Sequence, residues 1–126
     1  MAQTEGAMKY FLLINRNEAV YDQLSDAERQ ALHARYAAYG KKMMEAGIVQ
    51  GGAMLEPTRT ATTVRRRDGK RLITEGPFVE NAEQICGAAT IEVKDLDEAL
   101  EWAAGHPDAE LGSVEVRPIA PWKEGA

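Results

Sequence analysis

Residues 8–14 read MKYFLLI, a short run rich in β-favouring residues that predicts a strand. Its side chains alternate between two faces, with Tyr10 and Leu12 on one and Phe11 and Leu13 on the other. Both faces are apolar, whereas a strand with one wet face alternates apolar with polar residues. We therefore expect this strand to be covered on both sides.

Cap and turn signals place the other elements around this strand. A capping box at residues 25–28, SDAE, begins a helix, and the dipeptide Asp68-Gly69 is a tight-turn signal inside a hairpin. The predicted order is a strand at 8–14, a helix at 25–46, a strand at 48–55, a hairpin at 60–74, a strand at 85–93, a helix at 95–105 and a strand at 113–119. This order predicts an α+β protein, a ferredoxin-like sandwich with an inserted β-hairpin.

Helical spacing predicts which residues of the two helices face the sheet. They are Leu32, Tyr36, Tyr39 and Met43 in the first helix, and Leu96, Ala99, Leu100 and Ala103 in the second. Trp102 falls outside the second stripe. Because the helices cover one face of the sheet and no segment remains for the other, we expect a homodimer formed by sheet packing.

Composition excludes several classes of function. The chain has 126 residues, is 44% hydrophobic and carries a net charge of −5, which argues against a nucleic-acid partner. No apolar run is long enough to span a membrane, and no secretory signal is visible. One cysteine and two histidines exclude an intramolecular disulfide and most zinc sites, so we expect a cytoplasmic protein without a metal. We expect a loose segment at 1–7, one domain at 8–122 and a tail at 123–126.

The segment at residues 75–84, EGPFVENAEQ, resembles the DGPF motif of the YCII-related family. The resemblance extends to MKYFLLI, to TATTVRRRDGK at 60–70 and to GSVEVRPI at 112–119, in the same order and spacing. It implies a dimeric α/β barrel built from ferredoxin-like protomers.

The resemblance also implies a small-molecule enzyme without a cofactor, since a relative acts on chlorinated hydroxyquinols. The family's proposed machinery is a His–Asp pair, whose positions correspond here to Tyr36 and to His106, before Pro107. Relatives of the DGPF branch are often encoded beside alternative sigma factors, which implies a regulatory context. The two hypotheses are therefore an enzyme using acid–base chemistry in a cleft between sheet and helices, and a non-catalytic ligand-binding or regulatory module.

Three residues are candidates for catalysis. An ordinary imidazole titrates near neutral pH, so His106 is either a general base at the mouth of the cleft or a surface histidine after a helix. Glu75 ends a strand and is either a proton-transferring carboxylate or a residue that shapes the turn. Tyr36 either orients a substrate or simply packs in the core.

Four further residues are candidates for binding a small molecule. Arg117 either clamps an anionic group or forms a salt bridge with Glu75 or Glu115. Phe78 anchors its loop or lines the cleft, Glu80 binds ligand or solubilises the loop, and Tyr10 offers a hydroxyl or packs. We expect Cys86 to be a buried, inert thiol rather than a nucleophile. A pocket that unites His106, Glu75 and Arg117 would favour the enzyme.

Overall fold

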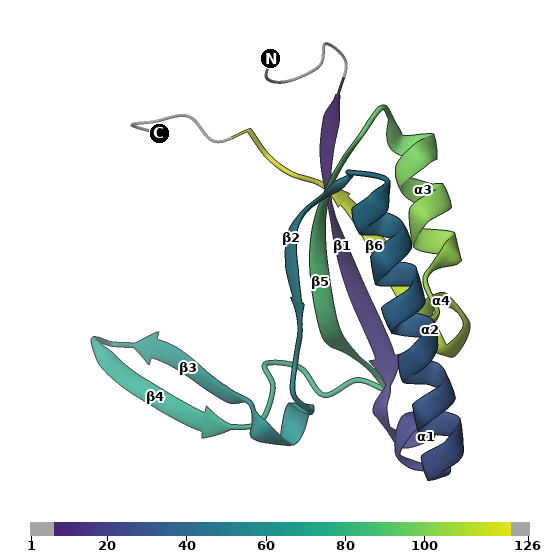
Figure 1. The fold of residues 1–126 in the computed structure, drawn as a ribbon. Helices are drawn as coiled ribbons and strands as arrows, with labels where there is room; N and C mark the ends of the chain where they lie inside the picture. Colours follow the sequence, from purple (N-terminus) through teal and green to yellow (C-terminus); the bar gives the residue numbers. More distant parts are fainter. Residues whose placement is uncertain (1–6, 122–126) are drawn as a thin grey trace.

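The computed structural model describes residues 7–121 as a four-stranded antiparallel sheet with helices on one face and a separate hairpin (Figure 1). The predicted loose segment at 1–7, apart from its last residue, and the predicted tail at 123–126 lie outside the described residues. The strands are β1 (Met8–Asn17), β2 (Val49–Met54), β3 (Thr62–Arg67), β4 (Lys70–Glu75), β5 (Glu83–Val93) and β6 (Gly112–Pro118). The helices are α1 (Glu18–Asp22), α2 (Asp26–Glu45), α3 (Leu96–Gly105) and α4 (Asp108–Leu111), with a 3-10 turn at Thr58–Thr60. The predicted α+β class is confirmed.

The main sheet has the strand order β2-β5-β1-β6, so β1 lies between β5 and β6. The predicted hairpin forms a separate two-stranded sheet of β3 and β4, which turns at Asp68 and Gly69 with positive φ angles of 52° and 76°. This hairpin projects away from the main sheet (Figure 1).

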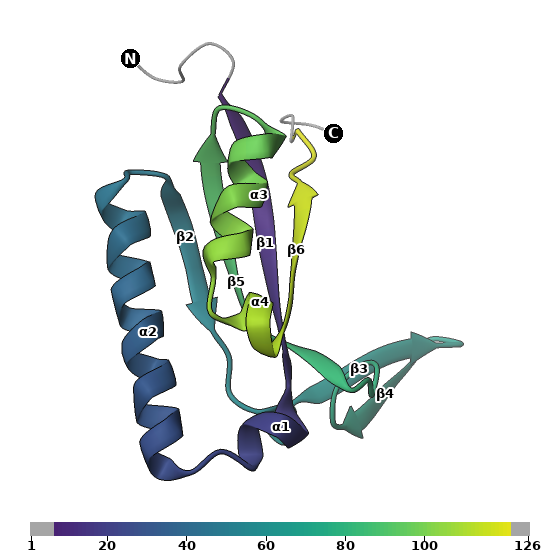
Figure 2. The same ribbon diagram turned by 90° about the vertical axis from the view of Figure 1, so that its right-hand side faces the viewer.

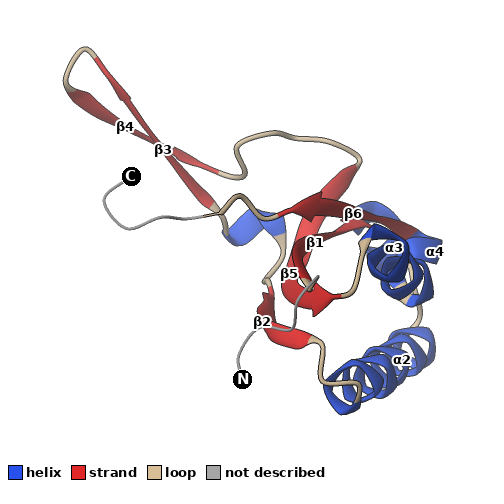
Figure 3. Ribbon diagram, turned by 90° about the horizontal axis from the view of Figure 1, so that it is seen from above, coloured by secondary structure: helices blue, strands red, loops and turns tan. Residues whose placement is uncertain are grey.

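The helices α2, α3 and α4 all lie on the same side of the main sheet (Figure 3). Figure 2 shows α3 and α4 in front of the sheet and α2 along its β2 side. The predicted capping box begins α2, since the Ser25 hydroxyl accepts from the Glu28 N–H and the Glu28 carboxylate accepts from the Ser25 N–H. On the other face, no described helix covers the sheet.

Strand β1 supplies the centre of the core. Tyr10, Leu12 and Ile14 are buried under the helices, as one face of the predicted strand requires. The other face is partly open, with Phe11 36% exposed. Both faces of the folded strand carry apolar side chains. The described residues cover only the face that carries Tyr10, Leu12 and Ile14.

The predicted inner face of α3 is partly wrong. Ala99 and Ala103 are buried against the sheet as expected, but Leu96 and Leu100 are each 46% exposed. Trp102, predicted to lie outside this face, is instead partly buried and packs on the core. The small alanines allow close approach to the sheet, so the helix turns its alanines inward and its two leucines outward.

Candidate functional site

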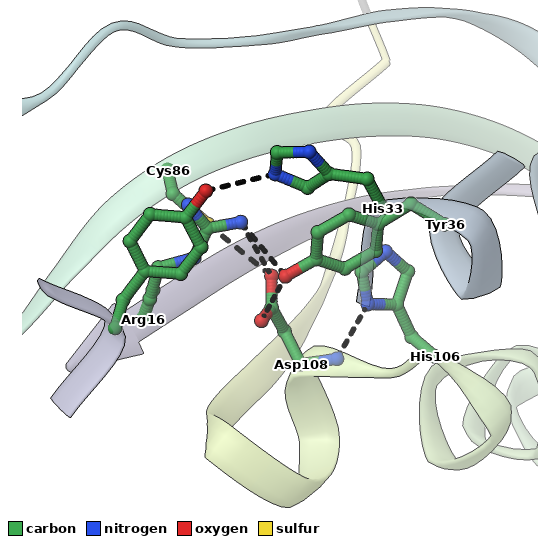
Figure 4. Close-up of polar contacts among 7 residues, drawn as sticks. Arg16, His33, Tyr36, Cys86, His106 and Asp108 are labelled. Atoms are coloured by element: carbon green, nitrogen blue, oxygen red, sulfur yellow. Dashed lines mark hydrogen bonds and ion pairs between the residues drawn. The ribbon is translucent and has the colours of Figure 1, made fainter. Parts of the chain in front are cut away.

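Asp108 is a fully buried charged residue at the centre of a polar cluster (Figure 4). It is the first residue of α4 and directly follows Pro107, the N-cap residue of that helix. Its Oδ1 atom accepts a hydrogen bond of 2.6 Å from the Tyr36 hydroxyl of α2. Its Oδ2 atom accepts from the Cys86 thiol at 3.4 Å and lies 3.7 Å from Nη2 of Arg16. The carboxylate therefore joins α2, β1, β5 and α4 at one point.

Arg16 supplies the positive charge beside Asp108. Its side chain is 13% exposed and its Nη2 atom donates a hydrogen bond of 2.7 Å to the Tyr36 hydroxyl oxygen. The guanidinium carbon lies 4.2 Å from the centre of the Tyr21 ring, in cation–π contact. The Nε atom is buried without a hydrogen-bond partner among the described residues. Arg16 thus depends strongly on Asp108 for compensation of its buried charge.

Tyr36 lies between these two charged groups and is held in its neutral form. Burial raises the pKa of Tyr36 above its ordinary value of 10.0, and the hydrogen bond to Asp108 raises it further. The hydroxyl accepts from Arg16 and donates to Asp108, so its proton points at the carboxylate. This orientation creates a short path for a proton from Tyr36 to Asp108.

Cys86 reaches the same cluster because β5 carries a bulge. The register of β1 against β5 shifts between Ile14 and Asn15, which pair with Gly87 and Ile85, so Cys86 is the extra residue. Cys86 is 6% exposed. Burial is the main cause that raises the pKa of its thiol to about 12, and the nearby charge of Asp108 is the second. The prediction of a buried thiol is confirmed, and a protonated thiol is a poor nucleophile.

The raised pKa of Cys86 predicts a loss of stability in alkaline solution. Above pH 9.0, the ordinary thiol pKa, the unfolded chain releases this proton while the folded chain keeps it until about pH 12. The free energy of unfolding should therefore fall as the pH rises through this range, by up to about 1.4 kcal/mol per pH unit from this group. Urea unfolding at pH 8, 9, 10 and 11 should give a shallower decline for Cys86→Ala than for the wild type. Equal slopes for the two proteins would contradict the prediction.

His106 faces the cluster from the C-terminal end of α3, and its hydrogen bond fixes its tautomer. Its Nδ1 atom accepts a hydrogen bond of 3.0 Å from the backbone N–H of Asp108. Burial lowers the pKa of His106 below its ordinary value of 6.5, so the ring is neutral at pH 7. Because Nδ1 is an acceptor, the single ring proton of this neutral form sits on Nε2. At neutral pH, the Nε2–H of His106 is therefore a hydrogen-bond donor, and its basic nitrogen, Nδ1, is occupied by the backbone N–H of Asp108.

An apolar cavity of about 480 Å³ lies between α2 and the sheet. Tyr36 and His106, whose ring centres are 5.8 Å apart, stand in its wall. The rest of the wall comes from α2 and from strands β1, β2 and β5: Leu12, Ile14, Tyr39, Gly40, Met43, Met44, Val49, Gln50, Gly51, Gly52, Ala53, Met54, Ala88 and Ala89. The cleft between sheet and helices that the sequence predicts thus coincides with a cavity that holds two of the predicted catalytic residues.

A second cavity, of about 590 Å³, lies on the other side of Tyr36. Its wall includes Arg16 and Cys86 from the cluster and Glu18, whose carboxylate is held by the N–H and hydroxyl of Thr58. Tyr36 and Met54 line both cavities, so the two spaces adjoin at the Tyr36 ring.

The other predicted catalytic residue, Glu75, lies elsewhere. It is exposed at the end of β4 in the projecting hairpin and lines neither of these cavities. Arg117 is opposite Phe11 on the open face of the sheet, and its Nε atom donates a hydrogen bond of 2.7 Å to Glu115. The structure therefore does not unite His106, Glu75 and Arg117, because strand alternation and the hairpin send the last two away from the helices.

The remaining predicted ligand-binding residues are dispersed as well. Tyr10 is buried in the core, where its hydroxyl contacts the Met8 sulfur at 3.6 Å. Phe78 is 73% exposed and lines a third cavity near the base of the hairpin, and its ring lies 5.6 Å from the Arg65 guanidinium. Glu80 is exposed in the loop before β5. None of the three lines the two cavities beside Tyr36.

Sequence reasoning missed Arg16 and Asp108, the two charged residues of the cluster. Arg16 is two residues beyond Ile14 and, by strand alternation, on the same buried face, so the pattern did hold a signal for it. Asp108 follows Pro107, whereas the family pattern places its aspartate before the proline. Its contacts with Tyr36 join residues 72 positions apart, and no local pattern indicates them.

Two kinds of feature are absent from the described residues, 7–121. They hold no group of three or more histidine, cysteine, aspartate or glutamate side chains able to bind a metal ion. None of the described helices is long and apolar enough to cross a membrane.

Comparison with known proteins identifies the family to which this chain belongs. The chain is 37% identical over 120 residues to an uncharacterized protein of Rhizobium meliloti (strain 1021), an alignment that covers 94% of this chain and 97% of that protein. A family model described as the YCII-related domain matches residues 8–123. This match confirms the resemblance at the level of the family, and the chain therefore belongs to the YCII-related family.

Proposed function

We propose that the protein is a cofactor-independent enzyme that moves a proton on a small molecule bound in the apolar cavity. The observation that carries this proposal is the Tyr36 hydroxyl, which lies between Arg16 and the fully buried Asp108 in a residue that lines the cavity. A buried carboxylate behind a hydroxyl beside an apolar cavity is a suitable arrangement for general base chemistry.

The proton moves in two linked transfers. The Tyr36 oxygen takes a proton from a C–H bond of the substrate while its own proton passes along the 2.6 Å hydrogen bond to Oδ1 of Asp108. The electron pair of the broken C–H bond moves toward a substrate oxygen, which becomes negative. The Nε2–H of His106, which lines the same cavity, donates to that oxygen. Tyr36 is the catalytic residue that touches the substrate, and Asp108 acts behind it.

Deuterium exchange into a ketone with an acidic C–H tests this proposal. In D₂O, the wild type should accelerate the incorporation of deuterium into 2-tetralone, followed by NMR. Asp108→Asn should lower the rate by about 100-fold, because an amide can accept the Tyr36 hydrogen bond but cannot take up the proton. The dissociation constant of 2-tetralone should change little, which separates a loss of proton transfer from a loss of binding.

Asp97→Asn is the matched control, since Asp97 is exposed on α3 and lies outside the cluster. It should exchange deuterium at the wild-type rate. Equal rates for Asp108→Asn and the wild type, or a wild-type rate no faster than buffer, would rule out the proton path through Tyr36 and Asp108.

A ligand-binding module without turnover is the second candidate function. The observation that favours it is the raised pKa of Tyr36, which makes the neutral hydroxyl hard to ionise. Such a module would bind 2-tetralone without accelerating deuterium incorporation, so the same experiment distinguishes the two functions.

We also propose that the chain forms a dimeric α/β barrel from two ferredoxin-like protomers packed through their sheets. The strand order β2-β5-β1-β6 supports the protomer topology. The open face of the sheet supports the assembly, since Phe11 and Leu13 lie on it with no described helix over them.

The sequence EGPF at 75–78 supports membership of the DGPF branch, and the buried free thiol of Cys86 supports a cytoplasmic location.

A further inference from the structure

We infer that the apolar cavity takes an uncharged molecule with an apolar body and a carbonyl oxygen that accepts a hydrogen bond from His106. The inference rests on the proposed function, because it names the class of substrate for the same site. Three properties of the cavity wall carry it: the absence of charge, the hydrogen-bond state of its polar groups, and its size.

Among the residues between 7 and 121 that line this cavity, there is no aspartate, glutamate, lysine or arginine. An ionised ligand would lose its hydration there without gaining a counter-charge from the wall, and such a transfer is costly. The charged pair of Arg16 and Asp108 lies behind Tyr36, and Arg16 lines the second cavity instead. The wall therefore selects against carboxylates, phosphates and ammonium groups.

Most polar groups in the wall already have partners within the chain. The Tyr39 hydroxyl donates to the backbone oxygen of Trp102 at 2.6 Å, and the Tyr36 hydroxyl donates to Asp108. The Gln50 side-chain amide donates to Glu92 at 3.3 Å. The hydroxyl protons of Tyr36 and Tyr39 and one N–H of Gln50 are therefore already donated within the chain.

His106 is different. Its Nδ1 atom is occupied by the backbone N–H of Asp108, and its Nε2–H has no hydrogen-bond partner among the described residues. The rings of Tyr36 and Tyr39, both from α2, each lie 5.8 Å from the centre of the imidazole and pack against it. A positioned donor in an apolar wall selects a ligand oxygen that can accept, because the N–H stays unpaired when that oxygen is missing.

The volume of about 480 Å³ is within the usual range for small-molecule pockets. A single six-membered ring with a short substituent is small enough to enter it. A carbonyl oxygen of such a molecule is also the atom that would become negative during the proposed proton transfer. The same donor thus serves both recognition and chemistry.

Three probes that share a benzene ring test the inference: acetophenone, which carries a neutral carbonyl; ethylbenzene, which lacks the oxygen; and benzoate, which is charged. Dissociation constants come from NMR titration of the wild-type protein at pH 7. We expect acetophenone to bind about fivefold more tightly than ethylbenzene, the effect of one hydrogen bond. Benzoate should bind at least about tenfold more weakly than acetophenone.

Two variants locate the donor. His106→Phe keeps a ring of similar size without the Nε2–H, so acetophenone should bind no more tightly than ethylbenzene. His106→Gln restores a donor near the Nε2 position and should recover part of the preference for acetophenone, which a purely structural role of His106 would not produce.

Benzoate binding as tightly as acetophenone would overturn the inference, as would equal binding of ethylbenzene and acetophenone to the wild type. Binding of none of the three probes would overturn it too. The titrations need no turnover, so they separate the two proposals. Acetophenone binding with the expected preference, in a protein that exchanges no deuterium into 2-tetralone, would leave the ligand class standing and the proposed enzyme function refuted.

Discussion

Asp108→Ala is expected to lower the free energy of unfolding by about 3–5 kcal/mol, the usual effect of removing one partner from a buried ion pair. The substitution leaves Arg16, 13% exposed and already carrying an unpartnered Nε atom, without its counter-charge. It also removes the acceptor of the Tyr36 hydroxyl and of the Cys86 thiol. Urea unfolding followed by circular dichroism at pH 7 measures the change.

Asp108→Asn is the milder variant of the same position. It keeps an acceptor for Tyr36 but loses the charge that compensates Arg16. Its free energy of unfolding should therefore lie between that of Asp108→Ala and that of the wild type. Asp97→Ala, on the exposed surface of α3, should lower the free energy of unfolding by less than about 1 kcal/mol. A loss below 1 kcal/mol for Asp108→Ala would show that the cluster does not hold α2, β1 and α4 together.

The fold was predictable because its signals are local. The two apolar faces of residues 8–14, the capping box at residues 25–28 and the turn at Asp68-Gly69 each depend on a few neighbouring residues. The inner face of α3 was harder to predict, because spacing alone does not say how far a helix is rotated about its axis. In the structure Ala99 and Ala103 face the sheet, because their small side chains let α3 lie close to it, and the larger Leu100 faces outward.

The candidate site was predictable only in part. Tyr36 and His106 were found through the family resemblance, and the structure places them together on one cavity wall. Their roles were not predictable, because the state of His106 depends on the backbone N–H of Asp108 and that of Tyr36 on Arg16, 20 residues away. Glu75 was chosen for ending a strand, but that strand belongs to the projecting hairpin rather than to the main sheet.

Leu13→Asp is expected to raise the dissociation constant of the proposed dimer by at least about 100-fold, since it buries an unpaired charge in the proposed interface, next to Glu115. Leu13 lies on the open face of β1, opposite Ala88 of β5 and Glu115 of β6. In light scattering at micromolar concentration, the wild type should have the mass of two chains and Leu13→Asp the mass of one.

Leu100→Asp supplies the matched control for this assembly. Leu100 is 46% exposed on α3, which packs on the opposite face of the sheet, so the same change of residue there should leave the dimer intact. Circular dichroism separates dissociation from unfolding, because a dissociated but folded Leu13→Asp protein keeps the wild-type spectrum. A wild type with the mass of one chain would refute the dimer itself, whereas two dimeric variants would place the interface away from this face. Since the predicted strand at residues 8–14 is apolar on both faces, a second copy packed on Phe11 and Leu13 would give its open face the cover that the helices already give Tyr10 and Leu12.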